Sequence, residues 1–164
     1  MKKILTMLLA VALIVVFGAF AMASGESENS DQGKDSVQGS ESGGNELGDY
    51  TVEIKSCRLA KDYEGKDVVI VKYEFTNHSD TPAAFYTAFD DNVYQNGVGL
   101  NGSYVIDDSY NYSADNQTKE IKKDATLEVE VAYELNDTTT DIEVEVGEFI
   151  SFNDSKITKT FSLQ

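Results

Sequence analysis

The chain of 164 residues has few of the side chains on which enzymes and metal sites commonly depend. It contains one cysteine, one histidine, one proline and no tryptophan. One cysteine excludes an intrachain disulfide, and one histidine excludes a zinc site with two histidine ligands. A Cys-His catalytic pair could be formed only by Cys57 and His78. The surrounding sequence favours burial of Cys57 and exposure of His78 in a polar turn, so we predict no enzymatic activity and no cofactor.

Basic residues are scarce as well. The chain has 13 Lys and Arg residues against 29 Asp and Glu residues, which gives a formal net charge of −16. Without the two lysines of the N-terminal targeting segment, 11 basic residues face 29 acidic ones and the net charge is −18. Such a surface repels nucleic acid and anionic lipid headgroups. We therefore expect no nucleic-acid partner, and the charge favours cationic partners. The export and the tyrosines described below make an extracellular protein or a carbohydrate the expected ligand.

A long hydrophobic run occurs at the N-terminus. Two lysines precede an uncharged apolar run from Ile4 to Ala23, and its last residues form an A-x-A cleavage pattern. This arrangement predicts a secretory signal over residues 1–23, cleaved after Ala23. The alternative is an uncleaved membrane anchor, because 20 residues at about 1.5 Å each can just span a bilayer. In both cases the rest of the chain is exported to the cell surface or the extracellular space, and only an uncleaved segment would contact the membrane.

Residues 24–48 have the composition of a linker. They include six Ser, six Gly and six acidic residues, with Val37 and Leu47 as the only large apolar side chains. Such a segment cannot bury enough apolar surface to offset its conformational entropy. We predict a disordered linker over residues 24–48, followed by one folded domain over residues 49–164.

The folded part is dominated by alternation of apolar and polar residues, most clearly over residues 126–135. A period of two places successive side chains on opposite faces of a strand. The glutamates of this segment fall on even positions, which predicts one acidic face in water and one face against a core. The predicted core positions are Leu127, Val129, Val131, Tyr133 and Leu135.

Comparable segments continue along the chain. A change of alternation at Cys57 and Leu59 predicts a β-bulge, and Asn96-Gly97 and Asn101-Gly102 predict hairpin turns. About seven strands at short spacing, with no clear helix, favour an all-β immunoglobulin-like antiparallel Greek-key β-sandwich. An up-and-down barrel is the alternative architecture. Besides shorter runs within 90–112, the predicted strands are 50–59, 67–77, 83–89, 126–135, 141–149 and 157–163.

Six segments of the folded part are distinctive: Tyr50–Ser56, Arg58–Lys66, Tyr73–Asn77, Tyr94–Val98, Asp107–Tyr110 and Tyr133–Thr139. They resemble an uncharacterised family of exported Gram-positive bacterial proteins, often lipoproteins, the domain-of-unknown-function family 5067. The resemblance covers essentially all of residues 49–164 and implies export and an immunoglobulin-like domain on a low-complexity tether. It implies no activity. The chain lacks the lipobox cysteine that a lipoprotein of this kind would carry.

Aromatic and amide residues gather in the least regular part of the chain. Tyr104, Tyr110, Asn111 and Tyr112 would form a ligand-binding surface if they project outward. Tyrosine offers flat apolar area and a hydroxyl group, which suits sugar or protein recognition. The alternative is that these tyrosines pack inward or cover a sheet edge.

Two acidic pairs are candidates for calcium binding. Asp90 with Asp91, and Asp107 with Asp108, supply carboxylate oxygens of the kind that calcium requires. Neither pair has EF-hand spacing, and the alternative is that both are solvated surface pairs in a strongly acidic domain.

Together these observations predict an exported, surface-associated, non-catalytic binding module for a protein, a sugar or a wall polymer. The alternative is a structural or accessory domain of an envelope assembly that has no tight ligand of its own and could be stabilised by calcium.

Overall fold

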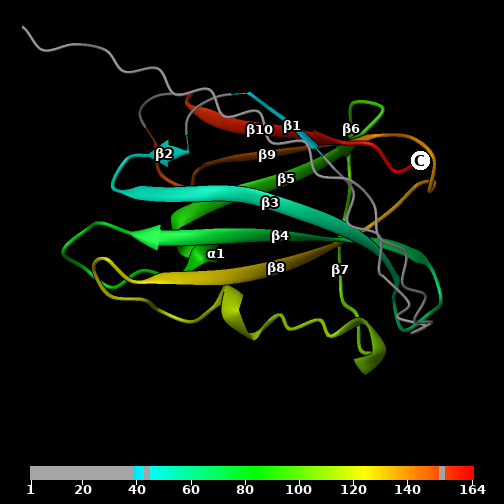
Figure 1. The fold of residues 1–164 in the computed structure, drawn as a ribbon, viewed down its shortest axis with the longest axis horizontal. Coiled ribbons are helices and arrows are strands. Elements are labelled where there is room, and N and C mark those ends of the chain that lie inside the picture. Colours follow the sequence, from blue (N-terminus) through cyan, green and yellow to red (C-terminus); the bar gives the residue numbers. More distant parts are fainter. Residues whose placement is uncertain (1–38, 43–44, 152–153) are drawn as a thin grey trace, which may run out of the picture. The chain divides into compact units, whose positions relative to one another are not determined.

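The computed structural model describes residues 39–42, 45–151 and 154–164. They form two five-stranded sheets in which neighbouring strands are antiparallel (Figure 1). One sheet has the order β2 (Glu46–Leu47), β3 (Tyr50–Lys61), β4 (Asp67–Asn77), β8 (Thr126–Glu134) and β7 (Gly102–Ser103). The other has the order β1 (Gly39–Ser42), β10 (Lys156–Phe161), β9 (Ile142–Glu148), β5 (Phe89–Gln95) and β6 (Val98–Gly99). The helical turns are α1 (Phe85–Ala88), η1 (Asp108–Tyr110) and η2 (Asp115–Gln117).

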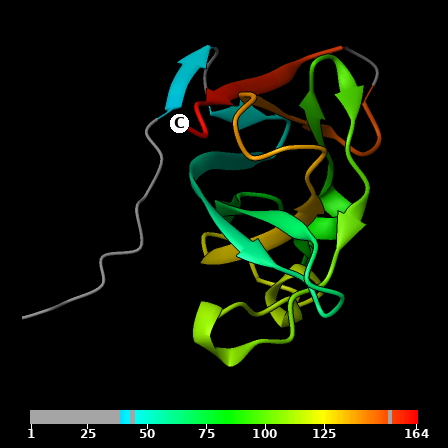
Figure 2. The ribbon, with the colours of Figure 1, turned by 90° about the vertical axis from the view of Figure 1, so that its right-hand side faces the viewer.

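This architecture confirms the predicted all-β, immunoglobulin-like antiparallel sandwich. The chain crosses between the sheets, so that strands distant in sequence become neighbours, as β4 and β8 do, and β5 and β9. Figure 2 shows the end of the sandwich at which the β3–β4 and β5–β6 turns lie. No helix in the described part of the chain is long and apolar enough to cross a membrane. The predicted signal or anchor, and residues 24–38 of the linker, lie outside the described residues.

The main core fills the space between the sheets and follows the predicted alternation. Strand β4 has the predicted bounds, and its inward side chains from Val69 to Phe75 are fully buried. In β8, Val129 and Tyr133 are buried, while Leu127 and Val131 pack against the same core. In β9, the inward residues are Ile142, Val144 and Val146, and all three are fully buried.

The predicted bulge is present in β3. The pairing of β3 with β4 shifts between Ile54 and Ser56, which leaves Lys55 as the extra residue. Because one added residue reverses the alternation, Cys57 turns inward and is buried. The bulge therefore turns Cys57 toward the core, whereas Leu59, two residues further along the strand, is 41% exposed.

A second, smaller core covers the outer face of the same sheet. It contains Ala60, Val68, Ile70, Val105 and Ala132, with Tyr110 and Tyr112 packed against it. The prediction that the even face of β8 lies entirely in water is therefore wrong at this end of the strand. The reason is that the connection between β7 and β8, which carries η1 and η2, packs against that face.

Three local predictions are corrected. Residues 83–89 do not form a strand: Ala83 makes one bridge to Ile121, and the chain then forms α1. The small and aromatic residues of this segment do not alternate strictly, so they do not require a strand. In α1, Phe85 and Ala88 are three residues apart and both face the core, as residues on one side of a helix do. Asn101-Gly102 is not a hairpin, because β6 and β7 belong to different sheets. By contrast, Asn96-Gly97 forms the predicted β5–β6 hairpin with positive φ angles of 53° and 72°.

The third correction concerns where pairing begins. Strands β1 and β2 lie within the range predicted as linker, and β1 pairs with β10 from Gly39 opposite Phe161 to Ser42 opposite Thr158. Strand β1 consists of Gly, Ser and Glu and therefore has no apolar alternation. It forms a strand because main-chain hydrogen bonds hold it at a sheet edge. Composition therefore could not reveal it.

Candidate functional site

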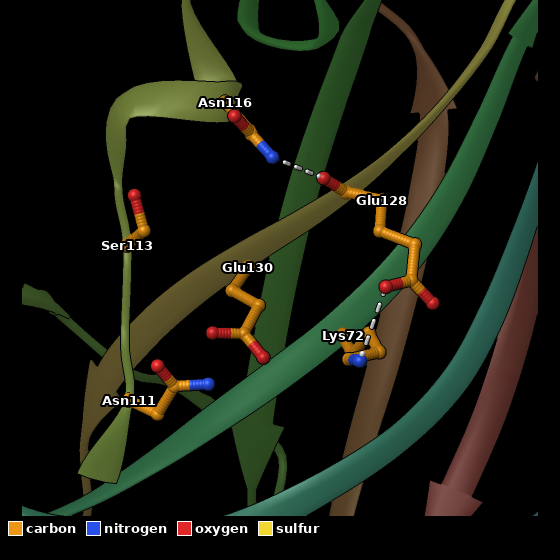
Figure 3. A pocket seen from close by; sticks show the side chains of 6 residues that line it. All are labelled: Lys72, Asn111, Ser113, Asn116, Glu128 and Glu130. Carbon is orange, nitrogen blue, oxygen red and sulfur yellow. Dashed lines mark hydrogen bonds and ion pairs between the residues drawn. The ribbon is translucent and has the colours of Figure 1, made fainter. Parts of the chain in front are cut away.

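A polar pocket lies on the outer face of β4 and β8, beneath residues 111–116 (Figure 3). Its cavity volume is about 240 Å³. Side chains from both strands and from the covering segment point into it. The lining residues are Lys72, Asn111, Ser113, Asn116, Glu128 and Glu130.

The strand side of the pocket is fixed by pairing between β4 and β8. Lys72 lies opposite Glu130 in the register, with Glu128 diagonal to it on the same face. The Nζ of Lys72 is 3.3 Å from Oε2 of Glu128. Diagonal neighbours on one sheet face are within reach of long side chains, so this ion pair follows directly from the register.

Arg58 of β3 holds Glu130 in a two-point contact. Its Nη1 and Nη2 donate to the two carboxylate oxygens at 2.6 and 2.9 Å. Nη2 also donates to the backbone oxygen of Tyr110 at 3.2 Å. Bidentate guanidinium–carboxylate contacts are strongly directional. Arg58 therefore orders the Glu130 carboxylate and ties the covering segment to the sheet at the same time.

Two side-chain amides complete the exposed edge of β8. Asn116 Nδ2 donates to the backbone oxygen of Glu128 at 2.8 Å, and Gln117 Nε2 donates to that of Glu130 at 2.6 Å. Strand β7 pairs with β8 only at Tyr133 and Ala132. The amides of η2 thus satisfy strand carbonyls that a longer neighbouring strand would otherwise bond.

Asn111 and Ser113 supply the open hydrogen-bonding groups of the pocket. Asn111 follows η1 with a left-handed conformation, φ 48°, and both side chains point into the pocket (Figure 3). Within the described part of the chain, neither side chain has a hydrogen-bond partner. The amide and the hydroxyl can therefore donate to and accept from a ligand.

The predicted tyrosines do not form one surface with Asn111. Tyr112, between the two pocket residues, packs instead on the second core with Tyr110. Burial raises the pKa of the Tyr112 hydroxyl. Tyr104 is exposed, and its ring stands edge-on to that of Tyr112 with 5.9 Å between centroids. Asn111 alone of the four predicted ligand-binding residues lines the pocket.

The two predicted calcium pairs lie on different parts of the fold. Asp90 and Asp91 belong to β5, where Asp91 turns inward and accepts a hydrogen bond from the Tyr133 hydroxyl. Asp107 caps η1 by accepting from the backbone N–H of Ser109 at 2.8 Å, and Asp108 is the first residue of that turn. Across the described ranges, no three His, Cys, Asp or Glu side chains are grouped so that they could hold a metal ion.

Cys57 and His78 are separated, in agreement with the expected burial of one and exposure of the other. Burial raises the pKa of the Cys57 thiol to about 12. His78 Nε2 lies 2.9 Å from the Thr51 hydroxyl, and its Nδ1 lies 3.5 Å from Asp124. The histidine therefore contacts partners at the start of β3 and before β8.

Most residues of the pocket were missed by sequence reasoning. The alternation places Lys72, Glu128 and Glu130 on the outer face of their strands and indicates nothing more about them, and no sequence pattern singles out Ser113 or Asn116. One signal was available: Ala132 interrupts the series of charged even positions in β8, and Val68 and Ile70 make β4 apolar on both faces. Those positions indicate a second covered face.

The sequence matches the family described as Domain of unknown function (DUF5067) over residues 25–148. None of the curated proteins compared with the chain matches it. Among solved structures, a candidate lipoprotein from Staphylococcus aureus subsp. aureus NCTC 8325 is similar, with 20% sequence identity and a TM-score of 0.56. The similarity covers 70% of this chain and 84% of that one. At this sequence identity, the comparison shows that the two folds are similar.

Proposed function

The chain belongs to the DUF5067 family, and from this premise we propose that it is an exported, surface-associated, non-catalytic binding module. Its ligand is a hydroxyl-rich unit of an extracellular carbohydrate or wall polymer, bound in the pocket beneath residues 111–116. The observation that carries the proposal is the pair of open hydrogen-bonding groups on Asn111 and Ser113, set above a pre-ordered polar floor.

The exported location is supported by two independent features. The N-terminal sequence has the charge, apolar run and small-residue ending of a secretory signal. The similar staphylococcal structure is described as that of a candidate lipoprotein, and lipoproteins are held at the outside of the cytoplasmic membrane.

The chemistry of the pocket favours an uncharged, hydroxylated ligand. Lys72 is paired with Glu128 and Arg58 with Glu130, so the charges around the floor balance. Balanced charges, an amide and a hydroxyl suit sugar hydroxyls, which both donate and accept. Pockets for drug-sized ligands measure roughly 300–1,000 Å³, and the smaller volume of this pocket, about 240 Å³, favours a single sugar ring.

The positions of three side chains support a non-catalytic role. The Cys57 thiol is buried among core side chains, and burial disfavours the thiolate that a nucleophile needs. The lone histidine is bonded elsewhere, to Thr51. Glu130 is held by both nitrogens of the Arg58 fork, and such a directional contact turns both carboxylate oxygens toward Arg58 rather than toward a substrate.

The proposal is tested by calorimetric titration of the intact protein with a panel of neutral tetrasaccharides. We expect at least one to bind with a Kd between micromolar and millimolar, and the Asn111→Ala/Ser113→Ala variant to bind it at least tenfold more weakly. Tyr104→Ala is the matched control, since this exposed ring lies outside the pocket. Equal affinity of both variants would contradict the proposed site, and no binding by any sugar would favour the accessory role.

A further inference from the structure

A second pocket lies at one end of the sandwich, between the two sheets, and it contains a carboxylate where the alternation predicts an apolar side chain. Ile142, Val144 and Val146 of β9 are all fully buried. Glu148 takes the next inward position, at the last residue of the strand. Glu148 is half-buried there, and a charge at such a position calls for a reason, because removing part of its hydration without supplying a partner is costly.

The pocket around Glu148 combines polar groups with an aromatic ring and small or aliphatic side chains. Its cavity volume is about 160 Å³, and it is lined by Tyr50, Thr87, Ala88, Glu148 and Ile150. The Tyr50 ring is held by edge-on contacts with Phe75 and Phe89, at centroid distances of 5.9 and 5.6 Å. One wall is therefore a rigid aromatic ring anchored in the main core.

The position of the Glu148 carboxylate depends on Gly48. This glycine has a positive φ of 56°, and a Cβ there would overlap the carboxylate. Any larger residue would both strain the turn and displace the carboxylate. Among the described residues, Glu148 forms no ion pair and its side chain makes no hydrogen bond, so no described residue neutralises its charge.

Large apolar side chains are exposed beside this carboxylate. Phe149 and Ile150 are 61% and 77% exposed, and Tyr86 on α1 is exposed as well. The backbone N–H of Phe149 donates to the oxygen of Ala88 at 2.9 Å, which fixes the start of the β9–β10 connection against α1. Exposed apolar groups gathered around a polar pocket are characteristic of protein-binding surfaces.

We propose that this pocket receives a Lys or Arg side chain from an extended segment of a partner protein. The aliphatic stem lies against Tyr50, Ala88 and Ile150, and the cationic head pairs with Glu148. An apolar residue next to the cation packs on Phe149 and Ile150. The net charge of −16 attracts a basic partner segment and steers its approach.

The pocket lies at the end of the domain opposite to its N-terminal connection. Gly39, the first residue of β1, lies opposite Phe161 at the end of β10, whereas Lys156 at the start of β10 lies opposite Gly147, next to Glu148. A strand of six residues separates these ends by roughly 20 Å at about 3.3 Å per residue.

The test begins with phage-displayed random 12-residue peptides selected on the intact protein. We expect the selected peptides to share a Lys or Arg next to an aromatic or aliphatic residue. One such peptide, labelled with a fluorophore, is then titrated by anisotropy. Glu148→Gln is expected to weaken binding at least tenfold, whereas Glu143→Gln, an exposed glutamate on the same strand, is expected to have no effect.

The apolar rim is tested with a second matched pair. The double variant Phe149→Ser/Ile150→Ser is expected to bind the same peptide at least tenfold more weakly. Val98→Ser/Ile106→Ser, whose side chains are 60% and 64% exposed elsewhere on the domain, is expected to leave it unchanged. Selected peptides without a basic residue, or equal effects of the two glutamate variants, would overturn the proposal. So would a concentration-dependent dimer abolished by Glu148→Gln, since the occupant would then be a second copy of this chain.

Discussion

The inner and outer faces of the β3–β4–β8 sheet both bury side chains, but by different means. The inner face meets a second sheet, and its buried positions are apolar in regular alternation. The outer face meets an irregular connection, which is held by five small or aliphatic residues, one bidentate ion pair and two side-chain amides. The inner face thus provides stability, whereas the outer face combines modest packing with polar groups that remain available to a ligand.

The largest expected effect is in the inner core. Phe75 is fully buried and its ring contacts those of Tyr50, Phe85 and Phe89. Phe75→Ala should lower the free energy of unfolding by about 3–5 kcal/mol, because it leaves a cavity that the sheets cannot close. Urea denaturation measures this loss. A cost below about 1 kcal/mol would show that the inner core is not the main source of stability.

A smaller effect is expected in the outer core. Ile70 is also fully buried, but against a single covering segment. Ile70→Ala should cost about 2–3 kcal/mol, the lower part of the range for such changes, because residues 104–117 can move into the space. Hydrogen exchange should speed up in this segment and not in β9. Unchanged exchange in residues 104–117 would contradict the described packing.

The Arg58–Glu130 contact should contribute less than either core. Both side chains are largely but not fully buried, so we expect a coupling energy of about 1 kcal/mol. A double-mutant cycle with Arg58→Met and Glu130→Gln, read by urea denaturation, measures it. The more exposed Lys72–Glu128 pair is the control and should couple by less than about 0.5 kcal/mol. If the two pairs couple equally, Arg58 does not have the structural role given to it here.

Two aspartates should show opposite dependence on pH, one inside the sandwich and one on its surface. Burial raises the pKa of Asp91, so its folded state takes up a proton at a higher pH than the unfolded state. As pH falls from 7 toward the ordinary Asp value near 3.9, the parent should gain stability relative to Asp91→Asn. A difference in unfolding free energy that does not change with pH would contradict the burial of an ionised Asp91.

Asp137 should behave in the opposite way. It accepts hydrogen bonds from the backbone N–H groups of Thr139 and Thr140, which lower its pKa from 3.8 to about 2. Its stabilising contribution is present above the ordinary value and is lost as pH falls through 2. The parent should therefore lose stability relative to Asp137→Asn between about pH 4 and pH 2, measured by thermal melting at fixed ionic strength. Parallel melting profiles of the two proteins would contradict this.

The same difference between the two sheet faces explains which parts of the fold and of the candidate site could be predicted from the sequence. The bounds of β4 and the inward residues of β8 and β9 were predicted because two apolar faces in contact impose a strict period of two. The position of the covering segment was not predicted, because single amides and one arginine make its contacts and these residues do not recur at a regular spacing. Strand β1 was missed because it is held by its backbone, and Glu148 because a single charge ending an apolar series resembles an ordinary strand end.

The most direct test of the central claim, that residues 111–116 and the outer sheet face form a binding site, is chemical-shift mapping on the intact protein. A tetrasaccharide that binds in calorimetry is titrated while the backbone and side-chain amide signals are followed by NMR. We predict that the largest shifts occur at Asn111, Ser113 and Asn116, with smaller ones at Lys72 and Glu128. Shifts confined to Tyr104, or to the Glu148 end of the sandwich, would contradict the claim.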